Sequence, residues 1–143
     1  MEITRAYVKS ILPHRDPEGH KGTFGKVYCL CGAVGYTGAP VLAASAAVRS
    51  GSGLVFLGVP KDIWPIVAVK CDSAMPSPLP SQQGKLALAA EDAVRARIDG
   101  CDAVLIGCGM GRSEESDALT RRLIDMDKPL VLDADGINAF ETH

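Results

Sequence analysis

A strand, a glycine-rich loop, a helix and a second strand follow one another in residues 20–60, and this succession constrains the fold more than any other part of the sequence. The apolar run 27–31 is typical of a buried strand, and regularly spaced glycines interrupt regular structure in residues 32–38. Pro40 suits the first turn of a helix, and the apolar run 54–59 resumes as a strand. This order predicts a parallel α/β unit, with the glycine loop at the carboxyl end of its first strand.

The position of this first glycine loop makes it a candidate binding site. Ligands of open parallel sheets bind outside the carboxyl ends of the strands, where helix N-termini present free N–H groups to anions and nucleotides. The pattern GxxGxxG differs from the dinucleotide pattern GxGxxG, and it lacks the Lys-Ser/Thr ending of a P-loop. Tyr36 and Thr37 add a stacking surface and a hydroxyl. The alternative is that the glycines and the small-sided helix after them serve close packing only.

Two later strand ends repeat the arrangement. A strand over 103–106 leads into the glycine-rich sequence GCGMG, and a helix over 114–126 follows. A further strand over 129–132 ends in the sequence DADG, in which Asp133 and Asp135 face the same way. Such acids can hold a divalent metal or a ligand hydroxyl, or Asp135 can cap a helix over 136–140. Because three strand ends converge at one sheet edge, this edge is the predicted site.

In the remaining segments, the sequence predicts three helices, an irregular arm and a loop. They are a short helix over 4–12, an irregular arm over 13–26, a helix over 61–70, a proline-rich loop over 71–84 and a helix over 85–98. We expect the proline-rich segment to be a plain crossover, with a mobile flap as the alternative, and the sheet to hold about four strands. The helix after the first loop should begin at Gly38 or Ala39.

Composition narrows the function classes. A length of 143 residues predicts one domain, and a net charge of −2 argues against nucleic-acid binding, although a basic cluster before the first strand could meet an anion: Arg15, His20, Lys21 and Lys26. No apolar run is long enough to cross a bilayer, and the first residues lack the apolar core of a signal peptide. Five cysteines without paired spacing argue against a zinc site and fit a reducing cytoplasm. Cys29 and Cys31 should be small buried residues on one face of a strand.

Four separated motifs resemble those of the ADP- or ATP-dependent NAD(P)H-hydrate dehydratases: HKGTFGKV, GYTGAPVLAASAAVRSGSGLV, GCGMGRS and LVLDADGIN. The resemblance implies a ribokinase-like three-layer α/β/α fold with a mostly parallel sheet. It implies repair of NAD(P)H hydrate with ADP or ATP and Mg²⁺, in which phosphorylation of the hydrate's hydroxyl and loss of phosphate restore the nicotinamide ring. The residues that it places around the hydrate are Gly35, Tyr36, Thr37, Gly38, Ala39, Gly109 and Gly111. The residues that it places near the phosphates or the metal are Asp133, Asp135 and Asn138.

Residues 1–143 match only the N-terminal half of a single domain of this family. The half that carries the adenine-nucleotide segment and the catalytic aspartate has no counterpart here, so we expect nucleotide binding without turnover by the chain alone. A second copy or a partner chain would then complete the fold. Departures from the family pattern are mild: Ala33 follows Gly32 where serine is usual, and Cys108 replaces proline. The alternatives are a ribokinase-like kinase for a vitamin precursor and a non-catalytic assembly domain.

Overall fold

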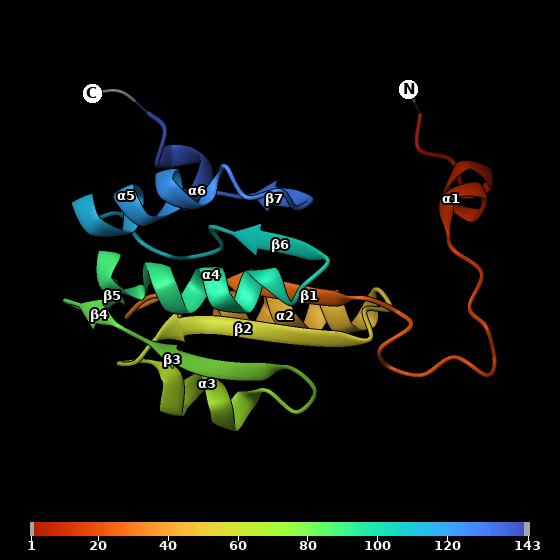
Figure 1. Cartoon of the computed structure of the whole chain (residues 1–143), viewed down its shortest axis with the longest axis horizontal. Helices are drawn as coiled ribbons and strands as arrows, with labels where there is room; N and C mark the ends of the chain where they lie inside the picture. The colour runs from red at the N-terminus through yellow and green to blue at the C-terminus, as the bar shows by residue number, and fades with distance from the viewer. Residues whose placement is uncertain (1, 142–143) are drawn as a thin grey trace.

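The computed structural model describes residues 2–141, which form a five-stranded parallel sheet with helices on both faces and one helix held apart (Figure 1). The strand order is β3-β2-β1-β6-β7, and every neighbouring pair is parallel. The bounds are β1 Lys26–Leu30, β2 Leu54–Pro60, β3 Met75–Leu79, β6 Ala103–Ile106 and β7 Leu130–Leu132. The carboxyl ends of all five strands therefore share one edge, which confirms the predicted fold class.

Side chains of β1 alternate between two hydrophobic cores, as expected of a central strand buried on both faces. Tyr28 and Leu30 pack in the core under α4 (Glu91–Asp99) and α5 (Glu114–Leu123). Cys29 and Cys31 pack on the other side, in the core under α2 (Gly38–Arg49) and α3 (Trp64–Lys70). Both cysteines are fully buried, as the sequence predicted. The two cores make the three layers α/β/α.

The proline-rich segment predicted as a loop contains an edge strand and a hairpin. In the described part of the chain, strand β3 pairs with β2 alone, and its prolines, Pro76 and Pro78, stand two residues apart. Their missing N–H groups therefore fall on one side, and an edge strand tolerates this because that side has no neighbour. The sheet has five strands instead of the expected four for this reason. The hairpin β4 (Ser81–Gln82) and β5 (Lys85–Leu86) follows.

The helix predicted over 85–98 is shorter than expected. Residues 85–86 belong to the hairpin, a 3₁₀ turn, η1, covers Leu88–Ala90, and α4 begins at Glu91. Gln83 and Gly84 both have positive φ angles, of 50° and 75°, which is the conformation of a two-residue hairpin turn. This turn overrides the helical periodicity of the residues after it. Helix α5 also ends early, at Leu123 instead of residue 126.

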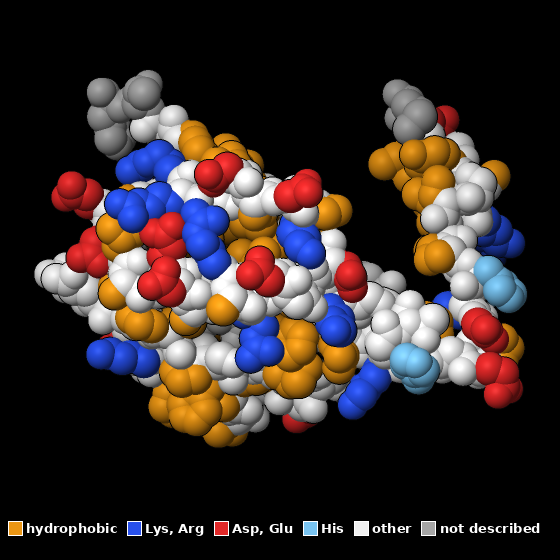
Figure 2. All heavy atoms as spheres, in the orientation of Figure 1, with side chains coloured by type: hydrophobic (Ala, Val, Ile, Leu, Met, Phe, Trp, Pro, Cys, Tyr) orange, Lys and Arg blue, Asp and Glu red, His pale blue; other side chains and the backbone are white. Residues whose placement is uncertain are grey.

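Helix α1 (Arg5–Ile11) stands apart from the body of the molecule, and none of its residues is buried (Figures 1 and 2). The Thr4 hydroxyl accepts a hydrogen bond from the Tyr7 N–H at 3.1 Å, which confirms the predicted helix and its cap. The apolar residues of this segment, Ile11 and Leu12 among them, remain exposed. Within residues 2–141, no helix has the length and apolar character that a membrane crossing needs.

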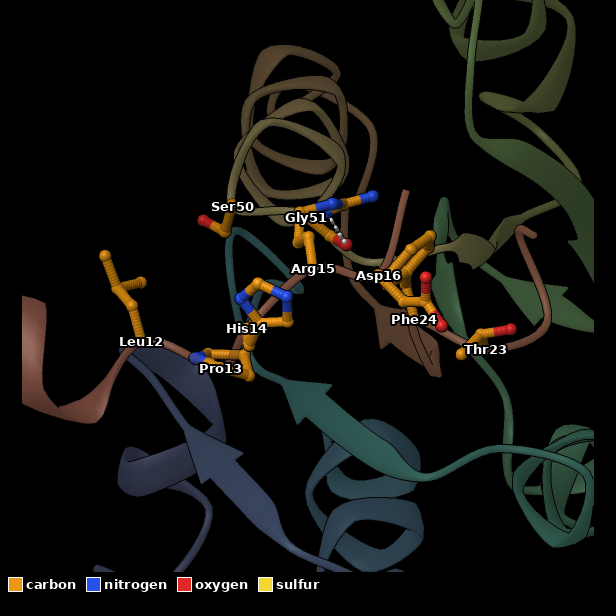
Figure 3. Close-up of a pocket in the computed structure, with 9 residues that line it drawn as sticks. All are labelled: Leu12, Pro13, His14, Arg15, Asp16, Thr23, Phe24, Ser50 and Gly51. Atoms are coloured by element: carbon orange, nitrogen blue, oxygen red, sulfur yellow. Dashed lines mark hydrogen bonds between the residues drawn. The ribbon is translucent and has the colours of Figure 1, made fainter. Parts of the chain in front are cut away.

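The arm between α1 and β1 is fixed to the body at the amino ends of the strands. The Arg15 guanidinium donates to the Gly51 carbonyl at 2.9 Å and lies 3.8 Å from the centre of the Phe24 ring. These residues border a cavity of about 290 Å³ (Figure 3). The basic cluster predicted before the first strand therefore lies at the edge opposite the glycine loops. Its His20 Nδ1 accepts the Gly22 N–H at 3.0 Å, within a local turn.

Candidate functional site

The first glycine loop, residues 31–38, contains glycines with two different roles. A Cβ on Gly32 would lie 2.8 Å from side-chain atoms of Ile63 and Pro40, so this glycine permits close packing. A Cβ on Gly35 or Gly38 would meet nothing within 4 Å. The backbone at these two positions therefore faces open space, where a ligand can approach it.

Two polar or aromatic side chains of the first loop remain available to a ligand. The Tyr36 side chain is 58% exposed. Thr37 is the residue before α2, which begins at the predicted Gly38, but the Thr37 side chain makes no capping hydrogen bond. Both the ring face and the hydroxyl are thus free to contact a bound molecule beside the helix N-terminus.

The second glycine loop, residues 107–111, is wedged between the first loop and the end of β7. A Cβ on Gly107, where φ is +127°, would lie 1.8 Å from the Asp133 carbonyl oxygen. A Cβ on Gly109 would lie 2.7 Å from the Cβ of Ala39, at the start of α2. The Gly32 N–H also donates to the Cys108 carbonyl at 3.0 Å. The two glycine loops are therefore in direct contact, as the convergence argument predicted.

Both aspartates of the DADG sequence contact this second loop. The Asp135 carboxylate accepts the Gly111 N–H at 2.8 Å, and the Cys108 thiol donates to the Asp133 carboxylate at 3.3 Å. Ala134, between the two, has φ of 42°, a strained value for a residue with a side chain. The chain holds this conformation where both acids reach the same loop, so Asp133 and Asp135 do face a common target.

The alternative in which Asp135 caps a helix over 136–140 is wrong. Helix α6 spans Asp135–Asn138, so Asp135 lies inside it, and the preceding residue Ala134 makes no side-chain capping bond. The Asp135 carboxylate instead joins α6 to the Gly111 backbone, 24 residues earlier in the chain. Asn138 is half-buried at the end of α6, one turn beyond Asp135.

The described residues do not by themselves form a Mg²⁺ site. No group of three histidine, cysteine, aspartate or glutamate side chains within residues 2–141 could hold a metal ion. One oxygen of Asp135 is already occupied by the Gly111 N–H. Mg²⁺ commonly uses only one or two protein carboxylates together with water and phosphate oxygens. Asp133 is the more exposed of the two acids, and one of its oxygens likewise accepts a hydrogen bond, from the Cys108 thiol.

The cysteines of the two loops form a polarised pair. A hydrogen bond from the Cys31 thiol lowers the pKa of Cys108 and outweighs the opposing effects of partial burial and of the Asp133 carboxylate, and the same interaction together with burial raises the pKa of Cys31. Burial raises the pKa of Cys71, which is half-exposed like Cys108. The thiolate is the reactive form of cysteine, so these opposite shifts predict different reactivities at two similarly exposed thiols.

We expect iodoacetamide to alkylate Cys108 before Cys71 at about pH 8, because lowering a pKa increases the thiolate fraction at a given pH. The ordinary pKa of a cysteine thiol is 9.0. The alkylation rate at Cys108 should reach half its maximum below that pH, and the alkylation rate at Cys71 should reach half its maximum above it. Peptide mass spectrometry of samples quenched over time measures both rates. Equal rates in the folded protein would contradict the lowered pKa of Cys108.

Sequence reasoning missed one part of the site, the β4–β5 hairpin. Its Gly84 carbonyl accepts the Val34 N–H at 2.8 Å, and its Lys85 ammonium donates to the Arg112 carbonyl at 2.7 Å. These contacts place the hairpin beside both glycine loops. The sequence signal was the pair Gln83-Gly84 ahead of Lys85, since glycine readily takes the positive φ of a tight turn.

The strand order and the two helical layers define a ribokinase-like α/β domain, with its glycine loops and the DADG sequence in contact at one sheet edge. A crystal structure of a ribokinase-like superfamily protein from Enterococcus faecalis superposes with a TM-score of 0.80 at 19% identity, covering 96% of this chain and 46% of that one. The family model of the NAD(P)H-hydrate dehydratases matches residues 27–143. The chain belongs to the NAD(P)H-hydrate dehydratase family.

Named relatives agree with this assignment. The chain is 41% identical to the bifunctional NAD(P)H-hydrate repair enzyme Nnr of Salinibacter ruber, over 99% of this chain and 27% of the relative. It is 35% identical to the ADP-dependent (S)-NAD(P)H-hydrate dehydratase of Neisseria meningitidis, over 90% of this chain and 40% of the relative. The ADP/ATP-dependent NAD(P)H-hydrate dehydratase of Bacillus subtilis, co-crystallised with ATP/Mg²⁺, superposes with a TM-score of 0.74 at 29% identity, covering 93% of this chain and 45% of that chain. The chain thus spans less than half the length of each of these relatives.

Proposed function

We propose that residues 1–143 are the N-terminal half of a single domain that dehydrates NAD(P)H hydrate with ADP or ATP. The observation that carries this proposal is the direct contact among three strand ends. The Gly32 N–H donates to the Cys108 carbonyl, and the Gly111 N–H donates to Asp135. Two glycine loops and two carboxylates are therefore assembled at the sheet edge where ligands of parallel α/β sheets bind, and the carboxylates suit the divalent cation that accompanies a nucleotide's phosphates.

The open part of the first loop would hold the nicotinamide nucleotide. Gly35 and Gly38 leave room for close backbone approach, and the Tyr36 ring is exposed for stacking. The residues that we assign to the hydrate are Gly35, Tyr36, Thr37, Gly38, Ala39, Gly109 and Gly111. Ala39 and Gly109 are in contact, so they would form the floor of this site. The residues that we assign to the phosphate region are Asp133, Asp135 and Asn138.

A bound ADP or ATP with Mg²⁺ would supply the phosphoryl group that activates the hydrate's hydroxyl as a leaving group. This chain's own contribution would be the surface of the first loop that orients the nicotinamide, together with Asp133 and Asp135 beside the phosphates and their cation. The catalytic aspartate expected in this family has no counterpart in residues 1–143. We therefore expect binding without turnover by these residues alone.

The open edge of β7 supports a partner that completes the domain. Within residues 2–141, strand β7 pairs with β6 alone, and Val131 on it is 60% exposed. Ile137 and Phe140, on or just after α6, are 57% and 40% exposed. An unpaired strand beside exposed apolar side chains is a typical docking surface, here for a second copy or for a chain that supplies the rest of the domain. Five free cysteines support a reducing location such as the cytoplasm.

Calorimetric titration tests the proposal on the 143-residue chain. We expect measurable heat with NADPH or its hydrate, and a Tyr36→Ala variant should bind about tenfold more weakly, because aromatic stacking contributes roughly 1 kcal/mol or more. Tyr7→Ala, on the detached helix α1, is the matched control and should leave the affinity unchanged.

Two results would contradict the proposal. One is the absence of heat with NADPH, its hydrate and adenine nucleotides alike. The other is phosphorylation of a small alcohol, with no effect on NADPH hydrate, when the chain is combined with the remainder of the domain. That second outcome would assign the chain to a ribokinase-like kinase instead.

A further inference from the structure

The β4–β5 hairpin contacts the first glycine loop through its backbone. The Val34 N–H donates to the carbonyl of Gly84, which is buried, at 2.8 Å. A Cβ on Gly84 would lie 2.4 Å from a methyl carbon of Val34, and φ at this glycine is +75°. The turn of the hairpin is therefore pressed against the residue that precedes the open part of the loop. Any shift of the turn would move the first loop.

The next residue of the hairpin contacts the end of the second glycine loop. The Lys85 ammonium donates to the Arg112 carbonyl at 2.7 Å. The Lys85 side chain also runs over Gly111, since a Cβ built on that glycine would lie 3.2 Å from the Lys85 Cε. Lys85 thus covers Gly111 with its alkyl stem and holds the following carbonyl with its charge. On the opposite side, the Gly111 N–H is held by Asp135.

The hairpin and the segment just after it are attached to the body of the protein at three points. The Ser81 hydroxyl donates to the Asp62 carboxylate, which follows the end of β2. Leu86 is 1% exposed and belongs to the core under α4 and α5. The Leu88 N–H donates to the Glu115 carboxylate of α5 at 2.9 Å. These three attachments join the hairpin and the segment just after it to the end of β2, to the core and to α5.

We propose that the β4–β5 hairpin sets the spacing between the two glycine loops, and that Lys85 is the positioning residue for the second loop. Two consecutive residues of the hairpin reach the two loops: Gly84 bonds to Val34 of the first loop, and Lys85 covers Gly111 of the second loop and bonds to Arg112, the residue that follows it. The ligand whose fit would depend on this spacing is the nicotinamide nucleotide, so that part rests on the proposed function. Lys85 acts through the Arg112 carbonyl and does not need to touch the ligand.

Three lysine variants test the proposal in the 143-residue chain. Lys85→Met keeps the alkyl stem over Gly111 and removes the hydrogen bond, Lys85→Arg restores a charged donor, and Lys70→Met makes the same chemical change at an exposed position on α3. We expect Lys85→Met to shift the amide NMR signals of Gly109 and Gly111 and to weaken NADPH binding about tenfold, the size expected for a lost hydrogen bond to a charged group. Lys85→Arg should restore most of the original amide signals and of the NADPH affinity, and Lys70→Met should change neither.

Ionic strength separates positioning from direct contact with a phosphate. If Lys85 positions the loop, the fold-loss in affinity should be the same at low and high salt, because the buried geometry is altered rather than a screened charge pair. A loss seen only at low salt would overturn the proposal in favour of direct contact. Unchanged signals for Gly109 and Gly111 in Lys85→Met would overturn it as well. If the unmodified chain fails to bind NADPH, the proposed function fails, and the amide shifts still decide whether Lys85 positions the loop.

Discussion

Replacing Gly107 by alanine is expected to destabilise the folded state by about 3 kcal/mol or more. The added Cβ would lie 1.8 Å from the Asp133 carbonyl oxygen and 2.6 Å from the Gly136 nitrogen. Both are backbone atoms, so neither can rotate away, and relief requires β6 and β7 to separate. The φ of +127° at Gly107 adds strain for any residue with a side chain. Urea unfolding followed by circular dichroism measures the loss.

Gly35→Ala is the matched control for this prediction. Gly35 also has a positive φ, of +90°, but a Cβ there would meet nothing within 4 Å. The Gly35→Ala substitution should lower the free energy of unfolding by about 1 kcal/mol, from the backbone conformation alone. Equal losses in the two variants would show that the close approach between the second loop and the end of β7 is not what makes Gly107 necessary.

Introducing a charge at Val131 is expected to weaken the proposed assembly at the open edge of β7. Val131 lies in the middle of the edge strand and is 60% exposed, so Val131→Lys should leave the fold of the single chain intact. Lysine on an edge strand opposes pairing with another chain, because a buried unpaired charge is costly. We expect the unmodified chain to have the solution mass of a dimer or a larger assembly, and the variant to associate at least about tenfold more weakly.

Light scattering with intact-mass spectrometry measures this effect over a range of concentrations. Val69→Lys is the control, because Val69 is 85% exposed on α3, which packs beside β3 at the other end of the sheet. It should not change the association. Two results would contradict the assignment of this edge as the interface. One is an unmodified chain that stays monomeric at all concentrations, and the other is a Val131→Lys variant that assembles normally.

The sequence was sufficient for the part of the fold that depends on strong local signals. The first strand, the glycine loop and the helix beginning at Gly38 occur where the apolar run and the glycines predicted them. The convergence of the two loops and the DADG sequence also follows from a general property of parallel sheets. The assignment of individual residues to a ligand stays a prediction.

The segment 71–90 could not be predicted because its local signals conflict with its tertiary environment. Pro76 and Pro78 argue against a strand unless the strand lies at a sheet edge, and edge position is a property of the whole sheet. Leu86 and the alanines after it have helical periodicity, but the turn at Gln83 and Gly84 places Leu86 in a hairpin. Lys85 was therefore predicted as the first residue of a helix, and its contact with the second loop was not predicted.

The Asp135 side chain shows a different limit. An aspartate at the start of a short helix is statistically a cap, and the sequence offered this explanation alongside ligand binding. The structure instead uses its carboxylate to hold the Gly111 N–H, 24 residues away. Predicting this contact requires knowing which strands are neighbours in the sheet, and a pattern of residues close in sequence does not contain that information.

The strand order has a consequence for how the protein folds. The central pairing of β1 with β6 joins distant parts of the chain, as the hydrogen bond from the Lys26 N–H to Asp102 shows across 76 residues. Contacts of this kind form slowly, because a long loop must close before they are gained. The two glycine loops meet only after β6 has docked, so the ligand surface arises late. A nucleotide that recognises this surface would then bind the completed fold selectively and draw the folding equilibrium toward it.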